Sequence, residues 1–467
     1  MDQVNVKATF RNDDLFARKQ YAKIGMKLIE NHPKEKGACT IAIDAPWGVG
    51  KSTFLHMWIN ELDLGNTLMY PNPIYRSEFK GKNVLPIYYN AWENDFSESA
   101  MVPLLYTICA QLDKKHEEGW LLPDDENVIV EFLSSCSSLL LMLLTYAFSE
   151  DEVAAQTAGA AGGLTIKGLL NLLARYVKRK DNEPEPDSIG AAYDKQLEIR
   201  GNFRNALVEL TKKCGGVYVF IDELDRCKPT FAIDTLEMIK HYFDIPGLVF
   251  VFGVDITQLS YAISGRYGEN FDAIGYLSKF FDHHILLPTP SAQQMIQYCM
   301  PSASLLSDSY RHMDEIFAAC KVTPREIPRI MKTSHTLLTL VFSNVWYGAR
   351  DQARKFIILL VSLRYRQTEI YQRYIGNVAG WNIYQWNQNH DFYELLSFFE
   401  PYMTMTADVC SKEWRSILQE EPDASRNDAL SIECSAIGRA ILECVQHYGG
   451  DTFGQCISAF LELAHLY

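Results

Sequence analysis

The sequence predicts an α/β fold in which a parallel sheet carries helices on both faces, with a helical insertion inside it and an all-α region after it. Three observations support this. An apolar, partly β-branched run at 40–43 leads through a glycine-rich loop into a helical pattern at 52–62. Two further apolar runs, at 217–221 and 248–254, are each followed directly by an acidic residue. Helical patterns separate these runs, and strands that alternate with helices form parallel sheets.

Composition restricts the class of protein and its partners. The 467 residues are 48% apolar, which is enough for two or three domains with a large core. The formal charge of −14 repels nucleic acid and anionic membranes at long range, so either partner would need a local basic patch. Eleven cysteines without a C-x-x-C pair, and an N-terminus without a secretion signal, predict a cytoplasmic protein with reduced cysteines.

The first helix is expected at 13–31, where apolar residues recur at helical spacing and Asn-His-Pro ends the run. A helix directly before the first strand can lie beside a base bound near the loop, or it can simply pack against the sheet. The sequence leaves both alternatives open.

The loop after the first strand has the composition of a phosphate-binding loop. Gly48 and Gly50 allow the backbone N–H groups to turn inward around an anion. Lys51 can reach the β- and γ-phosphates, and the Ser52 hydroxyl can bind Mg²⁺. Ala45 stands where the pattern G-x-x-x-x-G-K-[ST] has its first glycine, which puts only the turn out of the strand in doubt. The residues expected to contact a nucleotide are Pro46, Trp47, Gly48, Val49, Gly50, Lys51, Ser52 and Thr53.

A strand at 85–92 and a helix at 99–112 are expected next, followed by an insertion at 114–198 with two apolar stretches. The first stretch, 136–148, has 13 residues, whereas a membrane-spanning helix needs about 20. The second, 153–177, contains charged residues. These features favour a buried or partner-facing pair of helices over a membrane hairpin.

The apolar run at 217–221 ends in Asp222 and Glu223. Ligands collect at the carboxyl ends of parallel strands, so these carboxylates should face the phosphate loop. Asp222 is then suited to hold Mg²⁺ through water, and Glu223 to orient and deprotonate an attacking water. Together with the loop, the acid pair predicts a P-loop NTPase.

An acid and three arginines complete the candidate site. Asp255 could stand beside the γ-phosphate, or it could cap the helix that follows. Arg226 could stabilise the charge that develops in the transition state, or it could pair with a nearby acid. Arg325 and Arg329 stand at the head of a helical region, where they could reach a phosphate in a neighbouring subunit or lie on the surface.

The patterns divide the chain into four parts. The nucleotide domain is expected at 1–113 and 199–290, with the insertion at 114–198 between its halves and a helical C-terminal region at 291–467. The C-terminal region has no catalytic pattern. It is expected to contact a protein partner or a companion effector.

These motifs resemble the KAP P-loop NTPases over roughly the first 335 residues. The resemblance is carried by Ala-Pro-Trp-Gly-Val-Gly-Lys-Ser at 45–52, Asn-Ala-Trp at 90–92, Asp-Glu-Leu-Asp-Arg-Cys at 222–227, Val-Phe-Val-Phe-Gly-Val-Asp at 249–255, Tyr-Leu-Ser-Lys at 276–279 and Leu-Leu-Pro at 286–288.

The resemblance implies an ATPase of the additional-strand class, related to AAA+ and STAND proteins. Many members of that family insert membrane helices between the two motifs, but the insertion here is too polar to span. Animal members are membrane-anchored scaffolds, and bacterial members include phage-exclusion and other defence proteins. The acid pair here is Asp-Glu where the family often has Asp-Asp, which strengthens the prediction of a hydrolytic base.

Two functions of different classes follow from these observations. The first is an oligomeric switch that binds ATP and Mg²⁺, hydrolyses the ATP and passes its nucleotide state to a partner. The second is a nucleotide-binding scaffold with little turnover. Glu223 distinguishes them, because a scaffold needs no base. A GTPase or small-molecule kinase is disfavoured, since the chain has no Asn-Lys-x-Asp motif and no evident acceptor domain.

Overall fold

The computed structural model describes residues 5–33, 36–65, 83–117, 126–147, 189–268, 270–299 and 320–341, with a few single positions between 313 and 366. The contacts divide the chain into two compact units, Met1–Pro288 and Thr289–Tyr467.

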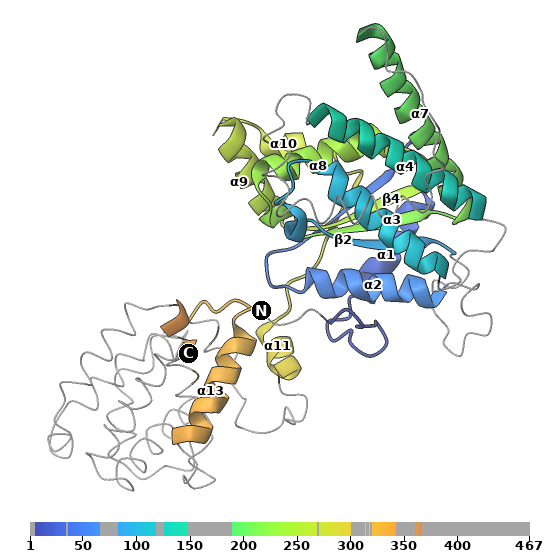
Figure 1. The fold of residues 1–467 in the computed structure, drawn as a ribbon. Helices are drawn as coiled ribbons and strands as arrows, with labels where there is room; N and C mark the ends of the chain where they lie inside the picture. The colour runs from blue at the N-terminus through green and yellow to red at the C-terminus, as the bar shows by residue number, and fades with distance from the viewer. Residues whose placement is uncertain are drawn as a thin grey trace, which may run out of the picture. The chain divides into compact units, whose positions relative to one another are not determined.

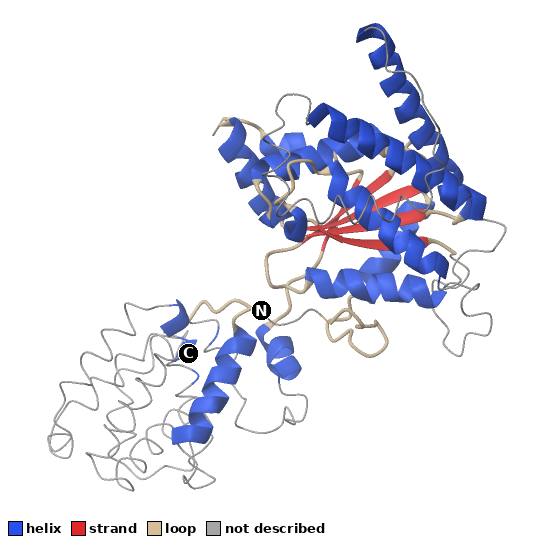
Figure 2. Ribbon diagram, in the orientation of Figure 1, coloured by secondary structure: helices blue, strands red, loops and turns tan. Residues whose placement is uncertain are grey.

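Within the described residues, five parallel strands form one sheet in the order β2-β3-β4-β1-β5 (Figures 1 and 2). They are β1 (Cys39–Asp44), β2 (Leu85–Asn90), β3 (Val217–Asp222), β4 (Leu248–Val254) and β5 (His283–Leu286). β4 lies between β1 and β3, so the strand before the phosphate loop and the strand before the acid pair are separated by one additional strand. The first four strands lie where the sequence predicts them. The short edge strand β5 was not predicted.

Helices cover both faces of this sheet, as the sequence predicts; Figure 2 shows the red strands between helical layers. α1 (Lys19–Glu30) and α2 (Lys51–Gly65) pack on one face, against the buried side chains of Ile41, Ile43 and Phe220. The opposite face carries a larger apolar core shared by α3 (Met101–Glu117), α4 (Glu126–Ala147), α7 (Ile189–Lys213), α8 (Pro229–Tyr242) and α9 (Ile256–Tyr267).

The first helix begins at Lys19 rather than near residue 13. The Asp14 carboxylate accepts the backbone N–H groups of Arg18 at 2.6 Å and Lys19 at 2.8 Å. It thereby satisfies donors that the first turn of a helix leaves without an intrahelical acceptor, so the helix begins after Asp14.

The first apolar stretch of the insertion, as far as it is described, belongs to α4. Phe132, Cys136 and Leu140 are buried in the larger core, and α4 packs along α7. Among the helices of the described ranges, none has the length and hydropathy needed to cross a bilayer. The second stretch, 153–177, lies outside the described residues. The expected domain boundaries at 113 and 198 fall inside α3 and α7.

The second unit is described only near its start. Its described helices are α11 (Ala292–Cys299) and α13 (Ile327–Val341). The expected helical region at 291–467 can therefore be compared with structure only at these described residues, where α11 and α13 are helical.

Candidate functional site

The loop from Ala45 to Gly50 joins the carboxyl end of β1 to the first turn of α2. Positive φ angles occur at Gly48 (81°) and Gly50 (92°) but not at Ala45. The backbone N–H of Ala45 donates to the Val254 carbonyl at 3.2 Å and so continues the ladder between β1 and β4. The position where the motif has its first glycine therefore does not require glycine's conformational freedom, and the Ala45 departure leaves the loop intact.

The Lys51 side chain lies against the inner side of this loop and is only 8% exposed. Its Nζ donates to the Ala45 carbonyl at 2.6 Å and lies 3.6 Å from Asp225 Oδ2. The same Asp225 oxygen accepts the indole N–H of Trp47 at 2.7 Å and the backbone N–H of Asp255 at 2.8 Å. Asp225 thus connects the phosphate loop to the start of α9.

Asp225 was not among the predicted site residues. It lies in η3 (Leu224–Arg226), a single turn that follows the acid pair and returns the chain toward the loop. The sequence shows only that Asp225 lies three residues after Asp222. A pattern that looks for acids directly after a strand does not select a residue at that distance.

Asp222 and Ser52, the two predicted Mg²⁺ ligands, are neighbours, and the Ser52 hydroxyl lowers the pKa of the Asp222 carboxyl. The Asp222 carboxylate is fully buried, and it accepts the Tyr88 hydroxyl at 3.0 Å and the Glu223 backbone N–H at 2.9 Å. Burial, assisted by the charge of Glu223, raises the pKa of Asp222 to about 6, although the hydrogen bonds to its carboxylate oppose this shift. The phosphate loop therefore lies beside the carboxyl end of β3.

Glu223 follows Asp222 in a left-handed conformation, with a φ of 59°. One carboxylate oxygen lies 3.1 Å from Arg226 Nη1, and the other accepts a side-chain N–H of Asn90 at 3.4 Å. The Arg226 guanidinium also lies over the Trp92 ring, 5.4 Å from its centroid. Arg226 therefore pairs with a nearby acid of its own chain, which is one of its two predicted alternatives. Asn90 and Trp92 had no predicted role at the site.

Comparison with known protein families matches residues 18–341, more than half of the chain, to the KAP family P-loop domain. The chain belongs to the KAP family. Among solved structures, the Walker-type ATPase PABY2304 of Pyrococcus abyssi is 12% identical, with 92% of this chain and 93% of that chain covered and a TM-score of 0.32. That TM-score is too low to support any argument from its architecture. No curated protein sequence matches the chain.

Membership of this P-loop family implies that the KAP domain binds a nucleotide and Mg²⁺. The observed donors fit the ion, because Mg²⁺ prefers hard oxygen ligands, and the Ser52 hydroxyl and the Asp222 carboxylate supply two at one point. The loop fits a polyphosphate, since the positive φ angles of Gly48 and Gly50 belong to a short turn that leads directly into the first turn of α2.

Asp255 lies at the same edge of the KAP sheet, where it caps α9. Its Oδ1 accepts the Gln258 backbone N–H at 3.1 Å. The capping alternative is thus observed, and contact with a γ-phosphate stays a prediction. Arg325, just before α13, and Arg329, in its first turn, are exposed; this is one of their two predicted alternatives, and contact with a neighbouring subunit's phosphate stays a prediction.

Arg18 is a further residue of the KAP domain that the sequence did not reveal. The residue is 2% exposed, and its guanidinium donates to the carbonyls of Val49 at 2.7 Å, Gly50 at 3.3 Å and Pro288 at 3.3 Å. Burial lowers the pKa of Arg18 to about 10. A buried cation is retained where acceptors replace its hydration, and here two of those acceptors belong to the phosphate loop. Arg18 therefore holds the loop from the side of α1.

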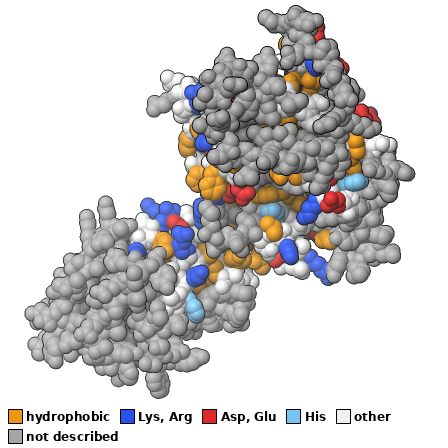
Figure 3. All heavy atoms as spheres, in the orientation of Figure 1, with side chains coloured by type: hydrophobic (Ala, Val, Ile, Leu, Met, Phe, Trp, Pro, Cys, Tyr) orange, Lys and Arg blue, Asp and Glu red, His pale blue; other side chains and the backbone are white. Residues whose placement is uncertain are grey.

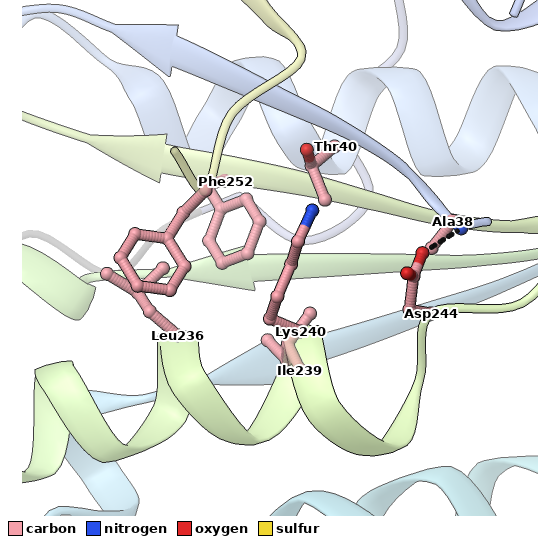
Figure 4. Close-up of a pocket in the computed structure, with 8 residues that line it drawn as sticks. Ala38, Thr40, Leu236, Ile239, Lys240, Asp244 and Phe252 are labelled. Carbon is pink, nitrogen blue, oxygen red and sulfur yellow. Dashed lines mark hydrogen bonds between the residues drawn. The ribbon is translucent and has the colours of Figure 1, made fainter. Parts of the chain in front are cut away.

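A small hollow at the amino end of β1 is separate from this site. It is lined by Ala38, Thr40, Leu236, Ile239, Lys240, Asp244, Phe252 and Phe280. Figure 4 shows Lys240 extending across it toward Thr40, and Asp244 bonded to the Ala38 N–H. Because the phosphate loop leaves the other end of β1, this hollow is not part of the nucleotide site.

Proposed function

We propose that this KAP protein hydrolyses ATP with Mg²⁺ and uses its nucleotide state to switch contact with a protein partner. The observation that carries the proposal is the proximity of the phosphate loop to the acids that follow β3, since Ser52 neighbours Asp222 and Trp47 Nε1 donates to Asp225 at 2.7 Å. Glu223 is the residue after Asp222. A metal ligand and a candidate base thus lie beside the phosphates that the loop would bind.

Each residue has a role that its position supports. The loop N–H groups and Lys51 would bind the β- and γ-phosphates, and Ser52 and Asp222 would hold Mg²⁺, whose charge would offset the negative charge on the phosphate oxygens. Glu223 orients the attacking water and accepts its proton. Arg226 and Asn90 position the Glu223 carboxylate.

The alternative, a nucleotide-binding scaffold with little turnover, is favoured by one observation. Both carboxylate oxygens of Glu223 already have partners, in Arg226 and Asn90. Glu223 must weaken at least one of these contacts to accept a proton from water. If it does not, the protein binds ATP and turns it over slowly.

The test compares ATP binding and hydrolysis in two variants of the full-length protein. Lys51→Ala removes a charge-assisted contact worth about 1.5 to 3 kcal/mol, so the Kd for Mg·ATP should rise by roughly 10- to 150-fold. Glu223→Gln should keep the wild-type Kd and lower kcat by roughly 10²- to 10⁴-fold.

The matched control for the first variant is Lys212→Ala, because Lys212 forms an exposed ion pair with Glu209 on α7. Its Kd and kcat should equal those of the wild type. Unchanged ATP affinity in Lys51→Ala would contradict the P-loop assignment. Unchanged turnover in Glu223→Gln would remove Glu223 as the base, and wild-type turnover near that of Glu223→Gln would favour the scaffold.

The proposal includes an assembly and a partner. We propose a homo-oligomer, with the helical region at 291–467 as the route to a protein partner or companion effector. Nucleic acid is not proposed, given the formal charge of −14. The described part of the face drawn in Figure 3 carries both acidic and basic side chains. A role in anti-phage defence stays a prediction from the family resemblance.

A further inference from the structure

Three side chains that can bind metals converge at the amino ends of β1 and β5, away from the nucleotide site. They are His32 in the turn after α1, Cys39 at the start of β1 and His283 at the start of β5. One ligand atom from each lies within 4.8 Å of the other two. β1 and β5 are hydrogen-bonded neighbours, with Ile41 opposite His283 in the register.

The His32 ring has a buried nitrogen without a partner. Its Nε2 is inaccessible to solvent and makes no hydrogen bond within the described part of the chain. The ring meets the His283 ring edge-on, with centroids 6.5 Å apart and planes at 81°. Burying a polar atom without a partner costs free energy, because its hydrogen bonds to water are not replaced. A bound cation would supply the missing partner.

The surroundings of Cys39 suit a cation. Cys39 is 3% exposed, and burial, together with the charge of Asp282, raises the pKa of its thiol to about 12, so a bound cation must displace the thiol proton. The Asp282 carboxylate is fixed there because one of its oxygens accepts both the backbone N–H and the hydroxyl of Thr40, at 2.9 and 2.8 Å. The Asp282 carboxylate is not one of the three ligands, but its negative charge attracts a cation to them.

We propose that His32, Cys39 and His283 bind a Zn²⁺ ion. Two imidazoles and a thiolate are donors that Zn²⁺ prefers, and a water can complete the tetrahedron. On binding, the Cys39 thiol releases its proton to solvent and forms the S–Zn bond, with no change of oxidation state.

The three ligand atoms must move closer together to bind one ion. Bonds of about 2.0 to 2.3 Å in a tetrahedron place ligand atoms roughly 3.3 to 3.8 Å apart. Pairs separated by up to 4.8 Å must therefore approach by about 1 Å. Rotation of the two imidazoles can supply this movement, since His32 lies in a turn and His283 at the end of an edge strand.

This site is distinct from the Mg²⁺ site. Cys39 and Asp44 are separated by five steps of β1, or roughly 16 Å at about 3.3 Å per residue, and the phosphate loop begins beyond Asp44. Zn²⁺ here would join the end of α1 to two strands without touching the nucleotide. The proposal therefore does not depend on ATP hydrolysis, and Lys51→Ala should retain the metal.

The test titrates the full-length, chelator-treated protein with Co²⁺, which gives the visible spectrum that Zn²⁺ lacks. About one equivalent should produce tetrahedral d–d bands together with a thiolate-to-cobalt charge-transfer band, and Zn²⁺ should abolish both. The charge-transfer band should be lost in Cys39→Ser. Removing a residue that hydrogen-bonds to a metal ligand weakens metal binding roughly 10- to 100-fold. Removing a ligand itself should cost more, so His32→Ala and His283→Ala should each weaken Co²⁺ binding by at least about 100-fold.

Two matched controls should keep the wild-type titration. Cys109→Ser changes a buried cysteine of α3, and His241→Ala an exposed histidine of α8. Lack of a charge-transfer band in the wild-type protein overturns the proposal without any variant, even if the ligand variants fail to fold. A band that persists in Cys39→Ser overturns it as well, because the thiolate then comes from elsewhere.

Discussion

The Asp222 carboxyl group illustrates how burial changes the chemistry of one residue. Its pKa is raised to about 6 in the folded protein, against 3.8 as the ordinary value. A carboxyl whose folded pKa is raised favours folding below pH 3.8, and this contribution is lost as the pH rises through about 6. At pH 8 the ionised carboxylate therefore destabilises the fold, and a bound cation would offset that cost.

We therefore expect Asp222→Asn to raise stability in Mg²⁺-free buffer at pH 8. The shift of about two pKa units corresponds to a gain of up to about 3 kcal/mol, and the gain should nearly vanish at pH 4. Urea unfolding at the two pH values measures this difference. Asp194→Asn, at an exposed position of α7, is the control and should show no such pH dependence. A loss of stability at pH 8 would contradict the burial argument.

Arg18 carries a second prediction at this scale. Arg18→Ala leaves the carbonyls of Val49, Gly50 and Pro288 without their charged donor, and it should cost at least about 2 kcal/mol of unfolding free energy. Affinity for Mg·ATP should fall by about tenfold or more, because two of those carbonyls shape the phosphate loop. Thermal unfolding and nucleotide titration measure the two effects.

The conservative variant sharpens this test of Arg18. Arg18→Lys should recover little, since one ammonium group cannot reproduce the fork of a guanidinium. Arg200→Ala is the matched control, because Arg200 also donates to a carbonyl, that of His241, but from an exposed position. If Arg200→Ala weakens nucleotide binding as much as Arg18→Ala does, the loop contact is not the cause.

At the scale of elements, the helix α4 is part of the core of the nucleotide domain although it lies in the predicted insertion. Phe132 of α4 packs on Phe203 of α7, with ring centroids 6.1 Å apart, and Phe203 packs edge-on against Phe243 at 5.6 Å. All three side chains are fully buried. This column of rings ties the inserted helix to the segment that follows α8.

We expect Phe132→Ala to destabilise the protein by about 3 to 5 kcal/mol, as for other large-to-small changes of buried aromatics. Ser138→Ala, at an exposed position of the same helix, should change stability by less than about 0.5 kcal/mol. Denaturant unfolding of both variants measures this. Equal, small effects would mean that α4 is a dispensable addition to the domain.

The elements also show where sequence reasoning succeeds. The first four strands were predictable because each is an apolar, β-branched or aromatic run with a clear polar end, such as Val217–Asp222. β5 was not, because His283-His284-Ile285-Leu286 has only two apolar residues and takes its strand conformation from pairing with β1. Tertiary pairing of this kind leaves no local pattern.

The site was predictable only where a local pattern marks it. Lys51 and Ser52 were predicted from the spacing of the loop motif, and Asp222 and Glu223 from their place directly after an apolar run; the roles of all four stay predictions. The contacts of Arg18 with the loop, and the convergence of His32, Cys39 and His283, join distant segments without a characteristic spacing. These residues come together because of the order of the strands in the sheet and the position of α1. Neither can be read from the sequence.

At the scale of the whole molecule, the predicted assembly rests on the arginines. Arg226 is engaged by Glu223 of its own chain, which leaves Arg325 and Arg329 as the candidates to act on a neighbouring subunit's nucleotide. An arginine supplied in this way accelerates phosphoryl transfer by about 10³- to 10⁵-fold.

If an arginine acts in trans, specific ATPase activity should rise with protein concentration. A mixture of Lys51→Ala with Arg325→Ala or Arg329→Ala should regain activity, because one mixed interface combines an intact loop with an intact arginine. Steady-state assays of the single variants and of the mixtures measure this. Specific activity that is independent of concentration, without complementation, would indicate a self-sufficient monomer.

The position of β1 inside the sheet has a consequence for synthesis on the ribosome. Both neighbours of β1, β4 and β5, are made later, and β4 begins at Leu248, 204 positions after β1 ends at Asp44. At about 5 to 20 residues per second, the nascent chain carries this apolar strand without either neighbour for roughly 10 to 40 s. Unpaired apolar strands are sites of aggregation, so this interval is when chaperones matter most to the protein. A chain cut short before Leu248 contains the whole phosphate-loop motif, but it lacks both strands that hold β1 in place.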